Sequence, residues 1–284
     1  MFHRTASACF VVALVLIFSS CEIINPDEPI PAYLACDTIY FSSSSSSQGT
    51  SSSHITDAWT YVDGQLLGAF ELPAKFPVLA EGSHTITVKP GILVDGIRAS
   101  RAAYPFYTSF DTTIHFEPGK TYSVIPHSTY LSQAFFVFVE DFEQSGLIFE
   151  RAPNSDTILS TVNDANAFEG HSGAIFLDEA HPYFNYRSFP YFSVTAGIPA
   201  YAELNYKCDN EFTIGLLSND GSGDYAQDIV TLRPADSWKK VYVSLAEWIS
   251  NVTPGSGFKL YITANRSSGL SPASIYLDNI KLIH

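Results

Sequence analysis

The chain has 284 residues, of which 29 are acidic and 15 basic, so its formal net charge at pH 7 is −14. This charge argues against nucleic acid and against anionic lipid headgroups as partners, because both repel an acidic surface. A chain of this length, with 14% aromatic residues, can build two β-domains with separate cores.

The first 20 residues predict a secretory signal peptide. Arg4 precedes an apolar run over residues 6–18, and two small serines follow before Cys21. A transmembrane anchor is the alternative interpretation, but the run is shorter than the ~20 residues that cross a bilayer. We therefore expect this segment to be removed on export.

The residues around Cys21 predict a lipid anchor. Phe18-Ser19-Ser20-Cys21 resembles a lipobox, which implies cleavage before Cys21 and acylation of that cysteine, and two or three acyl chains anchor a protein firmly. Residues 21–32 are rich in acids and prolines and predict an extended tether. The acidic stretch is similar to the surface-export signal of Bacteroidota lipoproteins, which implies an outer-membrane protein facing the cell exterior; a solvated stalk is the alternative.

Two cysteines remain in the rest of the chain, Cys36 and Cys208. They could pair in an oxidising compartment, but they fall in different predicted domains, and two cysteines make no disulfide scaffold.

Residues 33–133 predict a small β-sandwich of short strands and tight turns. Strands over residues 59–62 and 65–70 flank Asp63-Gly64, which supplies the positive φ angles of a two-residue hairpin turn. Residues 84–88 alternate as a strand, and Lys89-Pro90-Gly91 is expected to end it. The stretch over residues 62–91 resembles PEGA-like modules, which implies an immunoglobulin-like or PEGA-like sandwich.

A serine-rich run over residues 42–53 predicts a mobile loop. Three Asp-Thr-X triplets resemble the acceptor that Bacteroidota use for O-glycosylation, which implies possible modification at Thr38, Thr112 and Thr157.

Residues 134–284 predict a second sandwich, because four strands alternate cleanly between apolar and polar side chains. The apolar faces, which predict the core, are Ala202, Leu204 and Tyr206; Phe212, Ile214 and Leu216; Val241, Val243 and Leu245; and Phe258, Leu260 and Ile262. The opposite faces, expected to point outward, carry Tyr201, Glu203, Asn205, Tyr242, Ser244, Lys259, Tyr261 and Thr263.

Four stretches of this region resemble the galactose-binding-like jelly rolls of carbohydrate-binding modules: EDFE, FEGHSG, DSWKKVYVSL and SIYLDNIKLI. The resemblance implies an all-β chain, in which an immunoglobulin/PEGA-like β-sandwich is followed by a β-jelly-roll sandwich. It also implies an extracellular glycan as ligand.

Outward tyrosines can stack on sugar rings while neighbouring polar groups bind the hydroxyls. The predicted carbohydrate-binding residues are Tyr201, Glu203, Asn205, Tyr242, Tyr261 and Trp248. The same tyrosines are also ordinary strand formers, so an envelope structural protein or a docking surface for an envelope protein remains the alternative.

We expect no enzyme. A glycosidase needs two carboxylates set about 5–9 Å apart across a cleft. Acidic residues are available in this region, but none of them lies in a catalytic motif.

The jelly-roll resemblance further implies a structural Ca²⁺ ion where the first and last strands meet. The matching positions are the carboxylates of Glu143, Glu169 and Asp278 and the backbone carbonyls of Asp141 and Ser172. The apolar alternation of the last strand changes phase at Asp278-Asn279, which predicts a β-bulge that would re-aim the Asp278 side chain.

Overall fold

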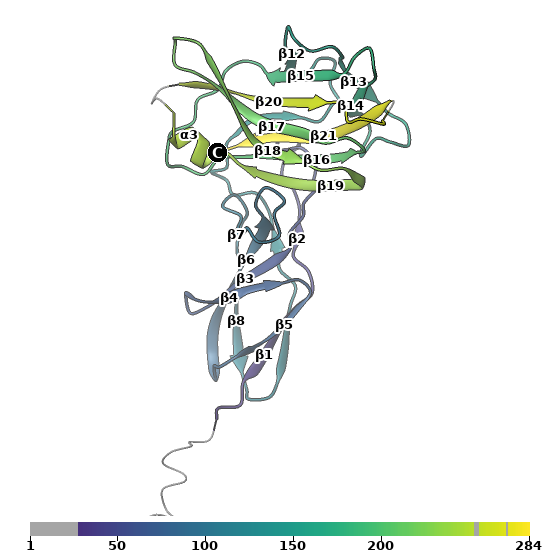
Figure 1. The fold of residues 1–284 in the computed structure, drawn as a ribbon. Helices are drawn as coiled ribbons and strands as arrows, with labels where there is room; N and C mark the ends of the chain where they lie inside the picture. Colours follow the sequence, from purple (N-terminus) through teal and green to yellow (C-terminus); the bar gives the residue numbers. More distant parts are fainter. Residues whose placement is uncertain (1–27, 253–255, 271) are drawn as a thin grey trace, which may run out of the picture.

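The computed structural model describes residues 28–252, 256–270 and 272–284. It is almost entirely β-structure, arranged as two sandwich domains joined end to end (Figure 1). The described chain begins at the free end of the first domain. The predicted signal peptide and the predicted lipidation site Cys21 lie outside the described residues. Among the described residues, no helix has the length and hydropathy needed to cross a membrane.

The first domain is an immunoglobulin-like sandwich. One sheet has the order β5-β1-β9, and the facing sheet has the order β4-β3-β6-β7, with β8 also paired to β6. Its elements are β1 (Ala32–Cys36), β2 (Tyr40–Phe41), η1 (Ser46–Gln48), β3 (Asp57–Val62), β4 (Gln65–Glu71), β5 (Ala74–Val78), β6 (Gly82–Leu93), β7 (Arg101–Ala103), β8 (Phe110–Phe116), β9 (Thr121–Val124) and β10 (His127–Ser128).

The predicted hairpin is confirmed, since β3 and β4 flank Asp63 and Gly64, which have φ angles of 49° and 81°. The predicted end of the next strand is wrong. Strand β6 continues through Pro90 to Leu93. Proline is tolerated there because β8 pairs with β6 only as far as Val88 and β7 starts at Gly91, so the missing N–H of Pro90 falls between two partner strands.

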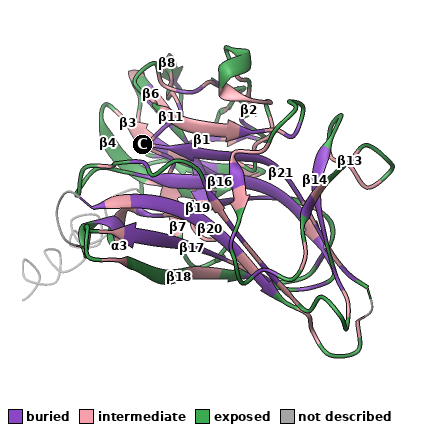
Figure 2. Ribbon diagram, turned by 90° about the horizontal axis from the view of Figure 1, so that it is seen from above, coloured by how far each residue is buried: buried purple, intermediate pink, exposed green. Residues whose placement is uncertain are grey.

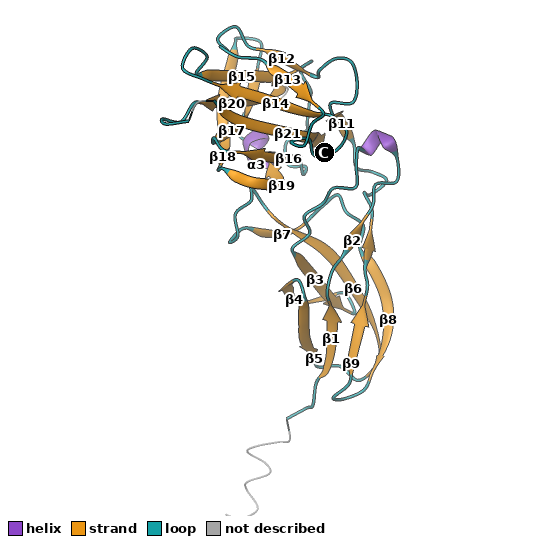
Figure 3. Ribbon diagram, turned by 90° about the vertical axis from the view of Figure 1, so that its right-hand side faces the viewer, coloured by secondary structure: helices purple, strands orange, loops and turns teal. Residues whose placement is uncertain are grey.

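The second domain is a β-jelly-roll sandwich. One sheet has the order β13-β14-β21-β16-β19, with β11 also paired to β21, and the other has the order β12-β15-β20-β17-β18 (Figures 2 and 3). Its elements are β11 (Phe136–Glu140), β12 (Phe149–Arg151), β13 (Leu159–Val162), β14 (Ser172–Leu177), β15 (Tyr183–Ser188), β16 (Tyr201–Cys208), β17 (Phe212–Asn219), β18 (Asp224–Leu232), β19 (Ala235–Ser244), α3 (Ala246–Ser250), β20 (Gly257–Asn265) and β21 (Ala273–Ile283).

The core of the second domain lies between these two sheets, and the four predicted apolar faces all contribute to it. The predicted bulge in the last strand is also confirmed. The register between β16 and β21 shifts beside Asp278 and Asn279, and Asn279 has a φ angle of 49°. In a regular strand, residues three apart point to opposite faces of the sheet. Because of the bulge, Leu277 and Ile280 are both fully buried.

The serine-rich segment, which was predicted to be a mobile loop, packs against other parts of the molecule. It contains the short 3-10 helix η1, and the residues after η1 contact the second domain. The Asn205 amide donates to Ser52 Oγ at 2.8 Å, and Lys281 Nζ donates to the Thr50 carbonyl at 3.0 Å. Cys36 and Cys208 are both buried and unpaired.

Candidate functional site

The outer face of the β12-β15-β20-β17-β18 sheet carries a groove of about 440 Å³. Strand alternation creates it. On β15, Phe184, Tyr186 and Ser188 point into the core, so the intervening side chains point outward. The groove is lined by Ala152, Pro153, Asn154, Tyr183, Asn185, Arg187, Leu217, Ala226, Asp228, Tyr261, Thr263 and Asn265.

Tyr261 forms part of the lining and is held in a fixed position. Its ring lies against Gly215 on the neighbouring strand β17, where any Cβ atom would collide with it. The Tyr261 hydroxyl donates a hydrogen bond to Asp228 on β18. Burial and then this bond raise the pKa of the Tyr261 hydroxyl above its ordinary value, so the ring stays neutral.

A network of charged side chains lies at one end of the groove. Lys259 Nζ lies 2.6 Å from Glu150 Oε1, and Arg187 lies between Glu150 at 3.4 Å and Asp224 at 3.7 Å. Hydrogen bonds from Tyr191 and then from Asn219 lower the pKa of the Asp224 carboxyl. These contacts hold the polar groups in place for hydrogen bonds with a ligand.

Two exposed aromatic rings extend this end. Lys259 Nζ lies 4.7 Å from the ring centroid of Tyr191 and 5.3 Å from that of Phe189. Phe189 is 62% exposed. Neither ring, nor any lining residue of β15, was predicted from the sequence, although the alternation of Tyr183, Asn185 and Arg187 with core residues was a signal for them.

Tyr261 is the one predicted carbohydrate-binding residue that lines the groove. Tyr201, Glu203, Asn205 and Tyr242 point away from the core of the second domain as predicted, but the predicted exposure of this face is wrong. They lie on β16 and β19 of the other sheet, and its outer face is covered by the first domain. Each of the four is at most 8% exposed.

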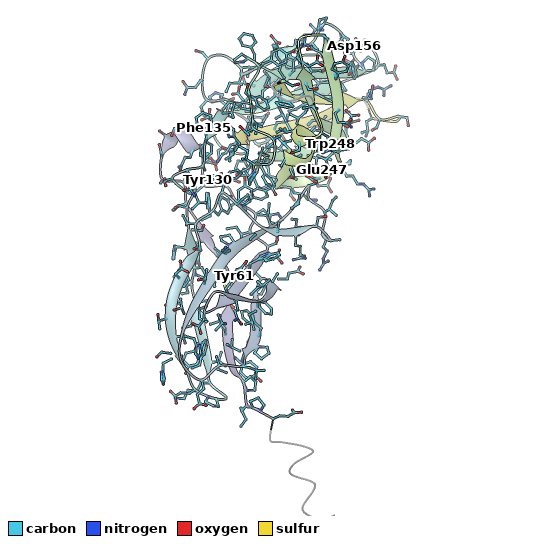
Figure 4. The ribbon with its side chains drawn as sticks, turned by 90° about the vertical axis from the view of Figure 1, so that its left-hand side faces the viewer. Tyr61, Tyr130, Phe135, Asp156, Glu247 and Trp248 are labelled. Carbon is cyan, nitrogen blue, oxygen red and sulfur yellow. The ribbon has the colours of Figure 1, made fainter. Side chains whose placement is uncertain are left out.

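Glu203 shows how completely this face is covered. The hydroxyls of Tyr104 and Tyr130, both from the first 133 residues of the chain, donate to the Glu203 carboxylate at 2.7 and 2.9 Å. Tyr130 lies at the junction of the domains in Figure 4. Lys240 Nζ lies 2.9 Å from the same carboxylate. Burial raises the pKa of Glu203, but Lys240 and Lys281 outweigh burial, so its pKa is lowered overall.

The tyrosines of this covered face are also engaged. The Tyr242 hydroxyl lies 3.1 Å from the Tyr107 hydroxyl and accepts a hydrogen bond from the His54 N–H at 2.9 Å. The Tyr201 ring packs on Tyr104, with their centroids 5.1 Å apart. The Tyr242 ring is therefore out of reach of a ligand from solution while the domains stay docked, whereas Tyr201 borders a separate depression of about 430 Å³ beside the junction.

Trp248 lies on α3 and does not line the groove. It packs partly buried against the core of the second domain. Its segment, residues 246–250, forms a short helix.

The predicted calcium ligands lie at one corner of the second domain, where they form two separate hydrogen-bonded clusters. The Ser172 hydroxyl donates to Asp278 Oδ2 at 2.6 Å, and the Glu143 carboxylate accepts from the His171 N–H at 2.6 Å. Asp141 accepts from the Glu143 N–H at 3.2 Å. Burial raises the pKa of Asp278 to about 7.

These hydrogen bonds pair the Glu143 and Asp278 carboxylates with groups of the protein itself. Within residues 28–252, 256–270 and 272–284, no group of three or more His, Cys, Asp or Glu side chains is placed to hold a metal ion. The arrangement of Glu143, Glu169 and Asp278 does not fit an ion as it stands, and the calcium site stays a prediction.

The three predicted glycosylation sites differ in exposure. Thr38 is exposed, whereas Thr112 and Thr157 are partly buried. The Thr157 hydroxyl donates to the Phe176 carbonyl at 3.0 Å. Modification of these threonines stays a prediction.

Comparisons with known proteins give structural likenesses only. No family model matches the chain, and no curated protein matches it. Among solved structures, CBM22-1-GH10 modules of a Clostridium thermocellum xylanase, complexed with xylohexaose, are 14% identical with a TM-score of 0.38, covering 52% of this chain and 28% of that one. The family 11 carbohydrate-binding module of a Clostridium thermocellum cellulase is 11% identical with a TM-score of 0.36, covering 52% and 93%.

A xylan-binding domain of family 22 is similar to the chain at 15% identity and a TM-score of 0.36, covering 52% of this chain and 92% of that domain. Some matched structures are glycoside hydrolases, such as an α-L-arabinofuranosidase bound to arabinose. The chain spans about a quarter of the length of the xylanase structure and of the arabinofuranosidase structure.

Proposed function

We propose that the groove on the β12-β15-β20-β17-β18 sheet binds an extracellular glycan without catalysis. The observation that carries this proposal is the lining of the groove, where the partly exposed ring of Tyr183 lies among Asn185, Arg187 and Asp228, beside the largely buried Tyr261. Sugar rings have apolar faces that stack on aromatic rings and hydroxyls that both donate and accept hydrogen bonds. The groove volume lies within the roughly 300–1,000 Å³ range of small-molecule sites.

The charges beside the groove favour a neutral glycan. Arg187 and Lys259 contribute two cations, whereas Glu150, Asp224 and Asp228 contribute three anions. The excess of negative charge, on a chain of net charge −14, would repel a polyanionic sugar.

A binding role without catalysis is supported by the contacts of these acids. Glu150 is paired with Lys259, and Asp228 accepts the Tyr261 hydroxyl. The general acid of a glycosidase needs a raised pKa, whereas the pKa of Asp224 is lowered. These carboxylates are suited to accept hydrogen bonds from sugar hydroxyls.

A glycan array tests the proposal, with residues 21–284 carrying Cys21→Ser as the soluble probe. We expect binding to a neutral glycan and no release of new reducing ends from the bound sugar. Release of reducing ends would make the protein an enzyme. Binding to no glycan would favour the second candidate below.

We also propose that lipid on Cys21 holds the chain to the outer membrane, facing the cell exterior. The apolar run followed by Cys21 and an acidic tether supports this. Incorporation of a radioactive fatty acid, absent in Cys21→Ser, is the expected result. Label that persists in the variant would contradict the anchor.

The second candidate is a structural or protein-interaction role in the cell envelope. The observation that favours it is the buried junction, where Glu203, Tyr104 and Tyr130 lock the two domains together. A rigid two-domain rod is suited to act as a spacer. This role needs no occupant in the groove.

A further inference from the structure

The free end of the first domain carries a patch of exposed apolar side chains, which we call the apolar tip: Ile30, Leu66, Leu67 and Leu79. Ile30 and Leu79 are 69% and 70% exposed. Two shallow depressions of about 340 Å³ each lie at this end, and Leu79 and Ala80 line both of them. The tip is therefore one continuous surface.

Backbone pairing brings the parts of the tip together. Ala32 pairs with Val78, which places the chain around Ile30 beside Leu79. The Gly119 N–H donates to the Pro31 carbonyl at 3.0 Å, so the turn after β8 supports the same segment. The β3–β4 hairpin adds Leu66 and Leu67 from the facing sheet.

Single exposed apolar residues are ordinary on protein surfaces, whereas a gathered group marks an interaction surface. The apolar tip belongs to the first domain and the groove to the second, and no residue lines both. The glycan proposal therefore leaves the tip unexplained.

The chain that precedes the tip indicates what covers it. Six residues lie between Cys21 and residue 28, where the described chain begins, so the seven Cα–Cα steps that join them span at most about 25 Å when fully extended. This step rests on the proposed lipid anchor at Cys21. A linker of this length keeps the tip close to the bilayer that holds Cys21. Asp63 and Glu81 line the depressions with the apolar residues, so an uncharged or zwitterionic lipid surface fits better than an anionic one.

We propose that the apolar tip contacts the lipid surface to which the chain is anchored. Leucine and isoleucine side chains at the tip enter the boundary between headgroups and acyl chains, where apolar area leaves water. The contact adds to the lipid on Cys21 and limits tilting of the first domain. The second domain lies at the opposite end of the molecule (Figure 3), so the groove is held away from the membrane.

Vesicle flotation of residues 21–284 carrying Cys21→Ser tests the tip without any attached lipid. The probe is a vesicle of phosphatidylcholine. We expect a fraction of the protein to float, and we expect Leu66→Ser combined with Leu79→Ser to lower the partition coefficient at least fivefold. Both side chains are exposed, so the melting temperature should not change.

The matched control removes two exposed apolar side chains from the second domain, by Ile158→Ser combined with Phe176→Ser. Its partition coefficient should equal that of the parent chain. Absence of flotation by the parent chain, or an equal loss in both variants, would overturn the proposal. Self-association that the tip variant abolishes, without flotation, would instead assign the tip to a second copy.

Glycan binding by the tip variant distinguishes this proposal from the proposed function. The variant leaves the groove unchanged, so it should bind the same glycan as the parent chain. Loss of flotation with glycan binding retained supports the tip. Flotation of a chain that binds no glycan leaves the tip standing and removes the groove proposal.

Discussion

Glu203, Lys240 and Lys281 bring three ionisable side chains into a region that water does not reach. Each side chain lies on a different strand of one sheet. Tyrosines of the first domain contact Glu203 and Lys281, and Lys240 lies against Glu203. One carboxylate faces two amines, so the cluster carries one excess positive charge if both lysines are protonated. Burying an uncompensated charge is costly, and the cluster lowers this cost when one lysine releases its proton.

Of the two lysines, Lys281 is the one that should release its proton. Burial, and then Lys240, lower the pKa of Lys281 from its ordinary 10.5 to about 7, whereas Glu203 opposes this shift. Between these two pKa values the unfolded chain holds a proton that the folded chain has lost. The free energy of unfolding should therefore rise with pH, by up to about 1.4 kcal/mol per unit from this group.

Denaturant unfolding of the parent chain and of Lys281→Met, at pH 7.5 and pH 9, measures this contribution. The parent chain should gain more stability over this interval than the variant does. Comparing the two chains cancels the titration of other groups. Equal gains would show that Lys281 stays protonated in the folded protein.

Two tyrosines show how far residue patterns can predict a site. Tyr201 and Tyr261 both alternate with core residues, and the sequence gives no reason to treat them differently. Tyr261 lines the groove, whereas Tyr201 packs on Tyr104 at the junction. The alternation could predict which face of each strand leaves the core, but not which outer face a second domain covers.

Two long strands, β6 and β21, each pair with two different strands along one edge. Strand β6 pairs first with β8 and then with β7, and β21 pairs first with β14 and then with β11. Pro90 marks the change of partner in β6, and the bulge at Asp278 and Asn279 marks it in β21. The sequence predicted the bulge because the apolar phase changes there. It did not predict the continuation of β6, because proline usually ends a strand.

The corner beside this bulge is where calcium would act, if the two clusters around Glu143 and Asp278 rearranged around an ion. An ion that binds only the folded chain stabilises it by about 2.7 kcal/mol at a concentration 100 times its Kd. If the clusters rearrange in this way, the melting temperature should be higher in calcium than in excess chelator.

The control for this experiment is Asp278→Asn, in which calcium should leave the melting temperature unchanged. Equal melting temperatures of the parent chain with calcium and with chelator, together with no bound metal by elemental analysis, would remove the site.

At the scale of the whole molecule, two sandwiches form one elongated unit with different surfaces at its two ends (Figure 1). The order of domains and the all-β architecture were predictable from strand patterns and turn residues. The docking of the domains was not, because it depends on contacts between distant segments, such as Tyr104 with Glu203. The one local signal of this docking was the aromatic run at Tyr104, Phe106 and Tyr107. These rings lie outside the core of the first sandwich and pack at the junction of the domains.

The central claim is that the groove, and not the covered face, is the glycan site. Its most direct test is the affinity of the array ligand for Tyr183→Ala, with Tyr225→Ala as the matched control. Tyr225 is a 58% exposed tyrosine on β18 that does not line the groove. Loss of one stacking ring should weaken binding by about 1 kcal/mol, roughly fivefold in Kd, and only in Tyr183→Ala. Unchanged affinity in Tyr183→Ala, or an equal loss in both variants, would contradict the groove as the binding site.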